Sequence, residues 1–152
     1  MTIPVNRRSA LTAAAGAALA GGPATGGQRT LAGRNRRTID AYVAACVTKD
    51  VEGIGRCLAD DVRFIGPMAE FQGREAVLQS FGKIFHILEK QVQRGTMVEG
   101  NRALMFYDFV CTPPIGVCRT AEYNELVDGK IARIELFFDA RPFEAAMKTH
   151  KS

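Results

Sequence analysis

The sequence has few of the residues on which small metal-binding or disulfide-rich proteins depend. Its 152 residues include only two histidines and four cysteines, too few for a histidine-rich metal site or a disulfide scaffold. It carries no serine nucleophile elbow, Cys-x-x-Cys pair, phosphate-binding loop or metal-binding histidine pair. These absences argue against a serine hydrolase, a thioredoxin-like protein, a nucleotide-binding protein and a zinc protein. We therefore expect neither a metal nor a cofactor.

Long runs of one charge are also absent. The 20 basic and 16 acidic residues are interspersed and give a net charge of +4. A basic group near the N-terminus, Arg29, Arg34, Arg36 and Arg37, has no aromatic residue among it for stacking on bases. These arginines indicate a solvated linker and the start of a helix, and we expect no nucleic-acid partner. With 47% hydrophobic and 24% charged residues, the chain has the composition of one globular domain.

Residues 1–28 have the layout of an export signal. Arg7 and Arg8 precede an uncharged Ala/Leu/Gly run over residues 9–27, which is too short and too weakly apolar for a stable membrane span. The two arginines resemble a twin-arginine signal, although Ala10 stands where such signals usually have phenylalanine. Residues 18–20, Ala-Leu-Ala, fit a cleavage site. This pattern predicts a periplasmic or secreted protein; the alternative is a flexible tail on a cytoplasmic protein.

The remaining chain predicts one α+β domain over residues 35–146. Helical periodicity indicates an opening helical hairpin, with Asp50 as the N-cap of its second helix, and later a longer helix whose His86 lies opposite the apolar stripe. Most of the C-terminal half alternates as strands separated by glycine- and proline-containing turns. We expect a curved, mainly antiparallel sheet with helices on one face. The predicted helices span residues 35–48, 51–58 and 74–89, and the strands 62–65, 92–98, 102–112, 117–127 and 130–138.

The loop at residues 113–116 predicts the register of the preceding and following strands. If Thr112 and Val117 flank this loop, Tyr107 lies opposite Glu122 and Cys111 lies opposite Cys118. The two cysteines could then form a disulfide in an oxidising compartment, or remain free and buried. Cys46 and Cys57 sit at different heights along the helical hairpin. We therefore expect these two to be free thiols.

The last turn admits two registers. A two-residue Asp128-Gly129 turn would place Glu122 opposite Glu135, a pair of like charges. A three-residue turn with a bulge at Gly129 avoids this and separates charged from apolar side chains, so we favour it. It collects on one face Met105, Tyr107, Phe109, Thr120, Glu122, Asn124, Ala132, Ile134, Leu136 and Phe138.

Glu122 is then an acid on an otherwise apolar inner face. A buried carboxyl must stay protonated, find hydrogen-bond donors or lie in a wet cavity. Tyr107 across the strands and Tyr42 from the first helix are the available phenols, so we predict Glu122, Tyr42 and Tyr107 as catalytic residues. A structural glutamate satisfied by two tyrosines, or a different register that leaves it outside, are the alternatives. The predicted ligand pocket comprises Phe64, Phe81, Met105, Phe109, Thr120, Asn124, Ile134, Leu136 and Phe138.

Three groups of residues resemble a known superfamily. They are the stretch from Tyr42 through Lys49-Asp50 to Pro67, the run Gly73-Arg-Glu-Ala-Val77, and Asp128-Gly-Lys-Ile131 with Phe138-Asp139. Together they resemble the nuclear-transport-factor-2-like superfamily, especially its SnoaL-like and ketosteroid-isomerase-like branches. The resemblance implies a cone-shaped α+β barrel with a deep apolar pocket, and homodimers formed through the outer face of the sheet.

The resemblance also implies roles for particular residues. Tyr42 falls where ketosteroid isomerases have their oxyanion-hole tyrosine. Glu122 falls where they have an acid that stays protonated because its apolar surroundings raise its pKa. Gly66 stands where the isomerases have their general-base aspartate. We therefore do not expect the proton transfer of ketosteroid isomerases, unless Glu70 in the following loop acts as the general base.

These observations leave three hypotheses of different classes. The first is cofactor-free isomerisation, cyclisation or dehydration of an apolar, carbonyl-bearing compound by Glu122 and the two tyrosines. The second is a noncatalytic carrier of a small apolar ligand. The third is a protein-interaction module whose outer aromatic residues, Phe106, Tyr123 and Phe137, form the surface for a second copy or a partner.

Overall fold

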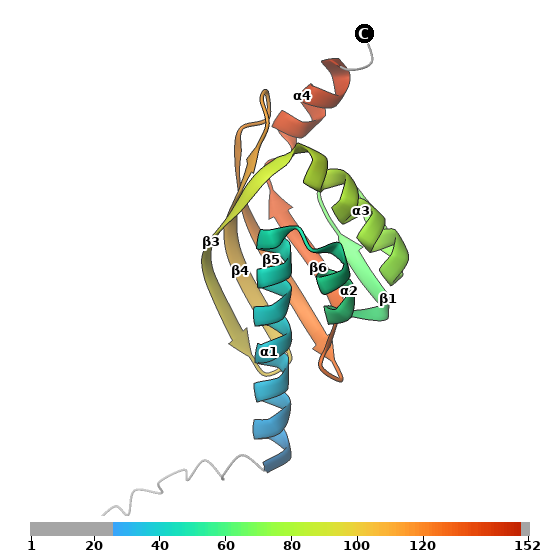
Figure 1. Cartoon of the computed structure of the whole chain (residues 1–152), viewed down its shortest axis with the longest axis vertical. Helices are drawn as coiled ribbons and strands as arrows, with labels where there is room; N and C mark the ends of the chain where they lie inside the picture. The colour runs from blue at the N-terminus through green and yellow to red at the C-terminus, as the bar shows by residue number, and fades with distance from the viewer. Residues whose placement is uncertain (1–25, 150–152) are drawn as a thin grey trace, which may run out of the picture.

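The computed structural model describes residues 26–149 as a curved sheet with its main helices on one side (Figure 1). This confirms the predicted α+β architecture. Two elements had not been predicted, the short strand β2 and the C-terminal helix α4. The elements in chain order are α1 (Gly26–Thr48), α2 (Val51–Cys57), β1 (Leu58–Ile65), β2 (Glu70–Gln72), α3 (Arg74–Ile87), β3 (Leu88–Glu99), β4 (Arg102–Cys111), β5 (Val117–Val127), β6 (Lys130–Phe138) and α4 (Arg141–Thr149).

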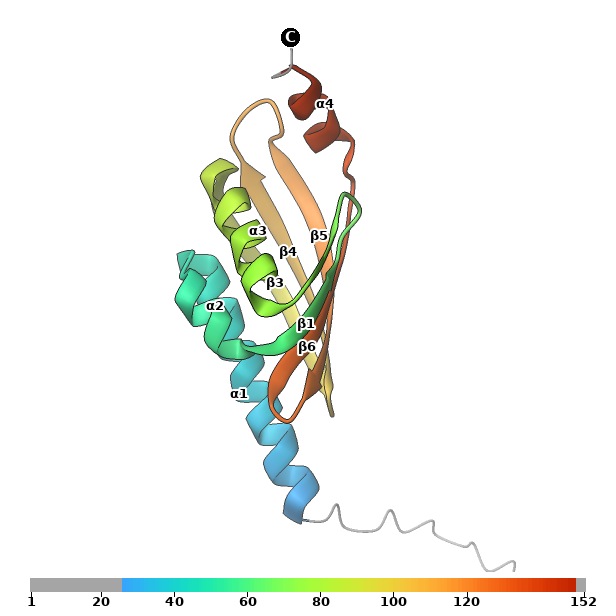
Figure 2. The same cartoon turned by 90° about the vertical axis from the view of Figure 1, so that its right-hand side faces the viewer.

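The sheet has six strands in the order β2-β1-β6-β5-β4-β3. Strands β1 and β6 are parallel, and every other neighbouring pair is antiparallel. Figure 2 shows α1, α2 and α3 together against one face of this sheet, while α4 lies beyond its end. The inner face, toward the helices, therefore carries the core, and the outer face has no helical layer in the described part of the chain.

The first helix begins at Gly26 rather than near Asn35, so the end of the predicted linker is helical. No proline lies between Gly26 and Thr48, so this stretch has no residue that would break the helix by removing a backbone N–H. The amide of Asn35 donates to the carbonyl of Gly100 at 3.0 Å, and Thr38 Oγ1 donates to the carbonyl of Gly129 at 2.7 Å. These two bonds hold α1 across the turns at one end of the sheet.

The junction of the helical hairpin is a left-handed residue followed by a helix cap. Lys49 has φ of 58°, and the next residue, Asp50, accepts a hydrogen bond from the backbone amide of Gly53 at 2.9 Å through its side chain. A carboxylate at this position satisfies an amide that has no partner within the helix. The prediction of Asp50 as an N-cap is confirmed.

The predicted register of β4 and β5 was wrong by two residues. Tyr107 lies opposite Thr120 and Phe109 opposite Cys118, whereas Glu122 lies opposite Met105. The cause is the turn: the amide of Cys111 donates to the carbonyl of Gly116 at 2.9 Å, so Thr112 belongs to the turn rather than to the strand. Because side chains alternate with a period of two, a shift of two residues leaves every side chain on its predicted face.

The predicted position of the bulge between β5 and β6 was also wrong. Asp128 and Gly129 both have positive φ, 51° and 78°, as a two-residue hairpin turn requires, and Val127 pairs with Lys130. The extra residue lies further along β6, where the register shifts between the pairs Leu126–Ile131 and Glu125–Arg133. Ile131 and Ile134 are therefore both buried, and Glu122 faces Leu136 instead of Glu135.

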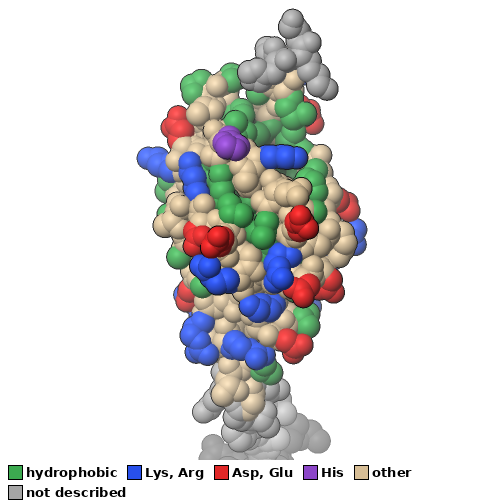
Figure 3. Space-filling view, turned by 45° about the vertical axis from the view of Figure 1, so that its right-hand side comes forward, with side chains coloured by type: hydrophobic (Ala, Val, Ile, Leu, Met, Phe, Trp, Pro, Cys, Tyr) green, Lys and Arg blue, Asp and Glu red, His purple; other side chains and the backbone are tan. Residues whose placement is uncertain are grey.

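The surface carries charges of both signs. Figure 3 shows Lys and Arg side chains close to Asp and Glu side chains over one face of the molecule. His86 is exposed near the end of α3, as predicted. No helix among the described residues is long and apolar enough to cross a membrane.

Candidate functional site

Glu122 lies in the middle of β5 on the inner face, and only 3% of its surface is exposed. Tyr107 Oη donates a 2.6 Å hydrogen bond to Glu122 Oε2, and Asn124 Nδ2 donates a 3.0 Å bond to Oε1. Tyr107 comes from β4, and Asn124 follows two positions later on β5 and so shares the inner face. Both oxygens of the carboxyl thus have a donor, and Tyr107, one of the two phenols predicted to accompany Glu122, is hydrogen-bonded to it.

Burial raises the pKa of Glu122 above its ordinary value of 4.5, because a charged carboxylate loses its hydration inside the protein. The hydrogen bonds from Tyr107 and Asn124, and the nearby Tyr42 hydroxyl, act in the opposite direction and offset part of this rise. The pKa of Tyr107 is also raised, first by burial and then by the neighbouring Glu122. The site therefore holds an acid with a raised pKa against a neutral phenol.

Tyr42 is fully buried in α1, and its ring meets that of Phe81 edge-on with centroids 6.3 Å apart. Its hydroxyl has no hydrogen-bond partner of good geometry, although it is close enough to Glu122 for each to affect the pKa of the other. Tyr42 does not line the cavity described below. Cys46, one turn later in α1, lines it instead, and burial raises the pKa of its thiol.

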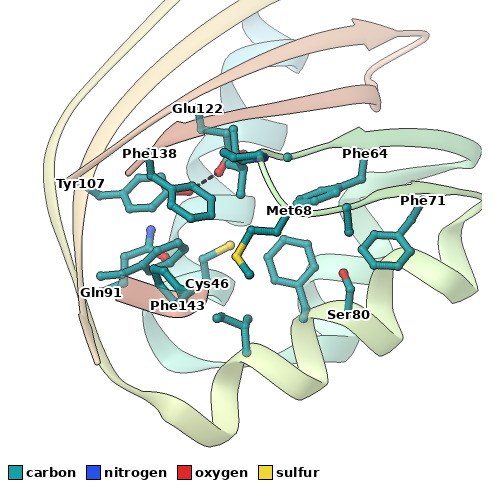
Figure 4. A pocket seen from close by; sticks show the side chains of 17 residues that line it. Cys46, Phe64, Met68, Phe71, Ser80, Gln91, Tyr107, Glu122, Phe138 and Phe143 are labelled. Atoms are coloured by element: carbon teal, nitrogen blue, oxygen red, sulfur yellow. Dashed lines mark hydrogen bonds between the residues drawn. The ribbon is translucent and has the colours of Figure 1, made fainter. Parts of the chain in front are cut away.

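An apolar cavity of about 140 Å³ lies between the inner face of the sheet and α3 (Figure 4). Glu122 and Tyr107 reach it from the sheet, and five of the predicted pocket residues line it. Its aromatic wall is continuous, with the ring of Phe64 5.8 Å from Phe71 and 6.3 Å from Phe81. The predicted residues that line the cavity are Phe64, Phe81, Phe109, Leu136 and Phe138.

Four predicted pocket residues do not line the cavity. Met105, Asn124 and Ile134 are buried in the core, and Thr120 Oγ1 donates to the carbonyl of Cys118. They point to the predicted face, but the sheet is longer than the cavity. The part of the inner face that packs against other core residues cannot be read from alternation alone, because that depends on where the helices lie.

Sequence reasoning missed a large part of the cavity wall. One group is the turn between β1 and β2, which pairs through the amide of Gly66 and the carbonyl of Ala69 at 2.9 Å. Another is α4, whose Phe143 packs on Phe138 with ring centroids 5.3 Å apart. The apolar turn around Pro67 was a visible signal for the first group. The missed lining residues are Cys46, residues 66–69, Phe71, Ser80, Ile84, Gln91 and Phe143.

The four cysteines are free and buried. Cys118 pairs with Phe109 and Cys111 with Leu88, so the predicted opposition of Cys111 and Cys118 is wrong. The reason is the two-residue shift in register at the preceding turn. Within the described part of the chain, no group of three or more histidine, cysteine and acidic residues could hold a metal ion.

Several solved structures share this fold. A protein from Kribbella flavida DSM 17836 is 24% identical, with a TM-score of 0.69 over 76% of this chain and 94% of its own. TerC, crystallised with polyporic acid, is 22% identical, with a TM-score of 0.63 over 74% of this chain and 96% of its own. A proposed polyketide cyclase from Sinorhizobium meliloti is 20% identical, with a TM-score of 0.61 over 66% and 94%.

At these identities the likeness shows the fold, which is that of NTF2-like cone-shaped proteins. No curated protein matches the sequence significantly. The SnoaL-like domain family matches residues 39–134, nearly two thirds of the chain. The matched segment runs from α1 into β6 and includes Tyr42, Tyr107 and Glu122. The chain therefore belongs to the SnoaL-like domain family.

Proposed function

We propose that this protein performs cofactor-free acid/base chemistry on a small apolar compound that bears a carbonyl group. The observation that carries the proposal is the Glu122 carboxyl, which lines an apolar cavity with a raised pKa and a phenol bonded to it at 2.6 Å. A carboxyl tuned toward neutral pH exchanges protons efficiently with a bound substrate. The polyketide-cyclase name of one structural neighbour is consistent with this class of substrate.

The surroundings of Glu122 narrow the mechanism. Among the described lining residues the other titratable groups are Tyr107 and Cys46, and the pKa of each is raised. Gly66 lies at the cavity where the isomerases carry a base, and Glu70 is exposed and paired with Arg63 at 3.1 Å. One carboxyl would then both take and return the proton. In its ionised form, Glu122 removes a proton from the carbon next to the carbonyl. Tyr107, whose single hydrogen is bonded to Glu122 in the free protein, turns that hydrogen to the enolate oxygen, and Glu122 returns the proton at another carbon.

A noncatalytic carrier is the second candidate, and Gly66 in place of a base is the observation that favours it. Both oxygens of Glu122 already accept hydrogen bonds within the protein. A ligand carbonyl or hydroxyl could therefore be held by Tyr107 and Glu122 without any proton transfer. Tyr42 does not line the cavity, so it would not contact the ligand in either case.

A one-ring unconjugated ketone, 3-cyclohexen-1-one, tests the two candidates. Its conversion to the conjugated ketone is followed by ultraviolet absorbance, and its binding by NMR titration. We expect Glu122→Gln to lower the rate by roughly 100-fold or more, the usual contribution of a general acid or base. Glu70→Gln, the matched change outside the cavity, should leave the rate unchanged. Binding without conversion by the wild-type protein would support the carrier instead.

We also propose that the protein is exported and that residues 1–20 are removed. This segment lies outside the described residues, and the first described element, α1, begins at Gly26. Cleavage after Ala20 would therefore leave every described helix and strand intact. It would remove Arg7 and Arg8 and no acid, so the net charge would fall from +4 to +2. The mass of the protein recovered from its own organism tests this; an uncleaved N-terminus would contradict it.

Finally, we propose that two copies associate through the outer face of the sheet. Phe106, Ala121 and Phe137 form one row across β4, β5 and β6. The two phenylalanines are 40% and 53% exposed, and α1, α2 and α3 lie on the opposite face of the sheet (Figure 2). Exposed aromatic side chains on a bare sheet face are typical of an interface.

A further inference from the structure

The cavity has a second polar side chain besides the Glu122 and Tyr107 pair. Gln91, on β3, lines it from the edge of the sheet, and Figure 4 shows Gln91 and Glu122 entering from different sides. Ser80 also lines the cavity, but its hydroxyl already donates to the carbonyl of Val77 in α3 at 2.7 Å. Gln91 is therefore a polar group of the wall whose bonding capacity the fold leaves largely unused.

The orientation of the Gln91 amide is set by its neighbour. Gln93 Nε2 donates to the carbonyl of Gly95 and to Thr96 Oγ1, both at 3.0 Å. This fixes Gln93 Oε1 as an acceptor, and it takes a long 3.4 Å bond from Gln91 Nε2. The side-chain oxygen of Gln91, Oε1, accepts no hydrogen bond from another described residue. It is left as an acceptor at the wall of an apolar cavity, and Nε2 keeps a second hydrogen to donate.

The register separates the two polar ends of the cavity. Gln91 is level with Phe109 on β4, whereas Glu122 is level with Met105. Four residues along a strand amount to about 13 Å, and two strand spacings to about 10 Å. The backbone positions of Gln91 and Glu122 are therefore well separated, which favours a different ligand atom for each side chain. A ligand that uses both in this way has two polar groups, one at each end of an apolar body.

The charge and the volume of the cavity restrict the ligand further. No lysine, arginine or histidine is found among the described residues that line the cavity. An anionic group on the ligand would lie there without a counter-charge, which is costly in an apolar environment. The volume of about 140 Å³ is close to that of an engineered cavity of about 150 Å³ that holds one benzene ring. A larger molecule must extend past the exposed turn that carries Met68.

We propose that Gln91 is the specificity-determining residue of this pocket, and that it selects uncharged, single-ring compounds carrying a second hydrogen-bonding group opposite the one held by Glu122 and Tyr107. This rests on the proposed function for the position of the first polar group. It goes beyond that function by naming the charge, the size and the second recognition point of the ligand.

Three phenols that differ only at the far end of the ring test the proposal: 4-hydroxybenzamide, which is neutral and polar, 4-methylphenol, which is apolar, and 4-hydroxybenzoate, which is anionic. Dissociation constants are measured by NMR titration against wild-type protein and Gln91→Met. We expect Gln91→Met to weaken 4-hydroxybenzamide by about threefold to tenfold, the net value of one hydrogen bond, and to leave 4-methylphenol unchanged. Gln79→Met, the same change at an exposed position of α3, should affect neither.

A gain of binding guards against a variant that is simply damaged. Gln91→Arg should reverse the preference, so that 4-hydroxybenzoate binds better than 4-hydroxybenzamide. An equal effect of Gln91→Met on the amide and on 4-methylphenol would overturn the proposal, as would wild-type protein that binds none of the three phenols. Neither result depends on turnover of 3-cyclohexen-1-one, so the acid/base proposal could still stand when this one fails.

Discussion

The residue on which the site depends is Glu122, and its place on the inner face follows from alternation along β5. The position of its hydrogen-bond partner was harder to predict. Tyr107 was expected directly opposite Glu122, yet it lies opposite Thr120 and reaches the carboxyl diagonally at 2.6 Å. Diagonal neighbours on adjacent strands are within reach of long side chains. The pair could therefore be predicted although the register was not, because both registers place the two side chains on one face.

The raised pKa of Glu122 predicts how stability depends on pH. The folded state holds the proton more tightly than the unfolded state, so the stabilisation from Glu122 is complete below its ordinary pKa of 4.5 and is lost as pH rises through the folded pKa. The Glu122→Gln variant has no titrating group at this position, so it lacks this dependence on pH. From about pH 4.5 upward, the free energy of unfolding of the wild type should fall relative to Glu122→Gln by up to about 1.4 kcal/mol per pH unit, then level off.

Chemical denaturation of both proteins over a range of pH measures this difference. Glu99→Gln, at an exposed position at the end of β3, is the matched control and should show no such trend relative to the wild type. A constant difference between wild type and Glu122→Gln from pH 4 to pH 8 would contradict the raised pKa.

At the scale of elements, the hairpin between β5 and β6 shows what alternation and charge can and cannot predict. Separation of charge correctly excluded Glu122 opposite Glu135, and the strands avoid that pairing by an extra residue in β6. The extra residue was predicted at Gly129, because a glycine in the turn fits a bulge there. The structure instead uses Asp128 and Gly129 for a two-residue turn and takes up the extra residue near Ala132.

Two elements that shape the cavity had weak local signals. Strand β2 has only three residues and exists through its pairing with β1, where Phe64 lies opposite Phe71. Helix α4 is short, and its buried Phe143 is held by Phe138. Short elements depend on tertiary contacts more than on local preference. This is why the Glu122 end of the site could be predicted and the rim of the cavity could not.

At the scale of the whole molecule, all the chemistry of the proposed site lies on one side of the sheet. Figure 2 shows α1, α2 and α3 on that side, so the other side is free to contact a second copy without blocking the cavity. The outer face also carries an acid with an unused acceptor: Asp108 pairs with Arg94 at 3.0 Å through one oxygen, while its other oxygen is buried without a partner. Polar and aromatic groups thus lie together on the proposed contact surface.

If two copies meet through this face, a charge placed in the aromatic row should separate them. Phe137→Glu puts a carboxylate where an apolar ring would be buried, and the like charge of the second copy would face it across the two-fold axis. We expect light scattering to give the dimer mass for the wild type and the monomer mass for Phe137→Glu. Val47→Glu, the same kind of change at a 43% exposed position of α1, should remain dimeric. A monomeric wild type, or an unchanged mass for Phe137→Glu, would contradict a dimer through this face.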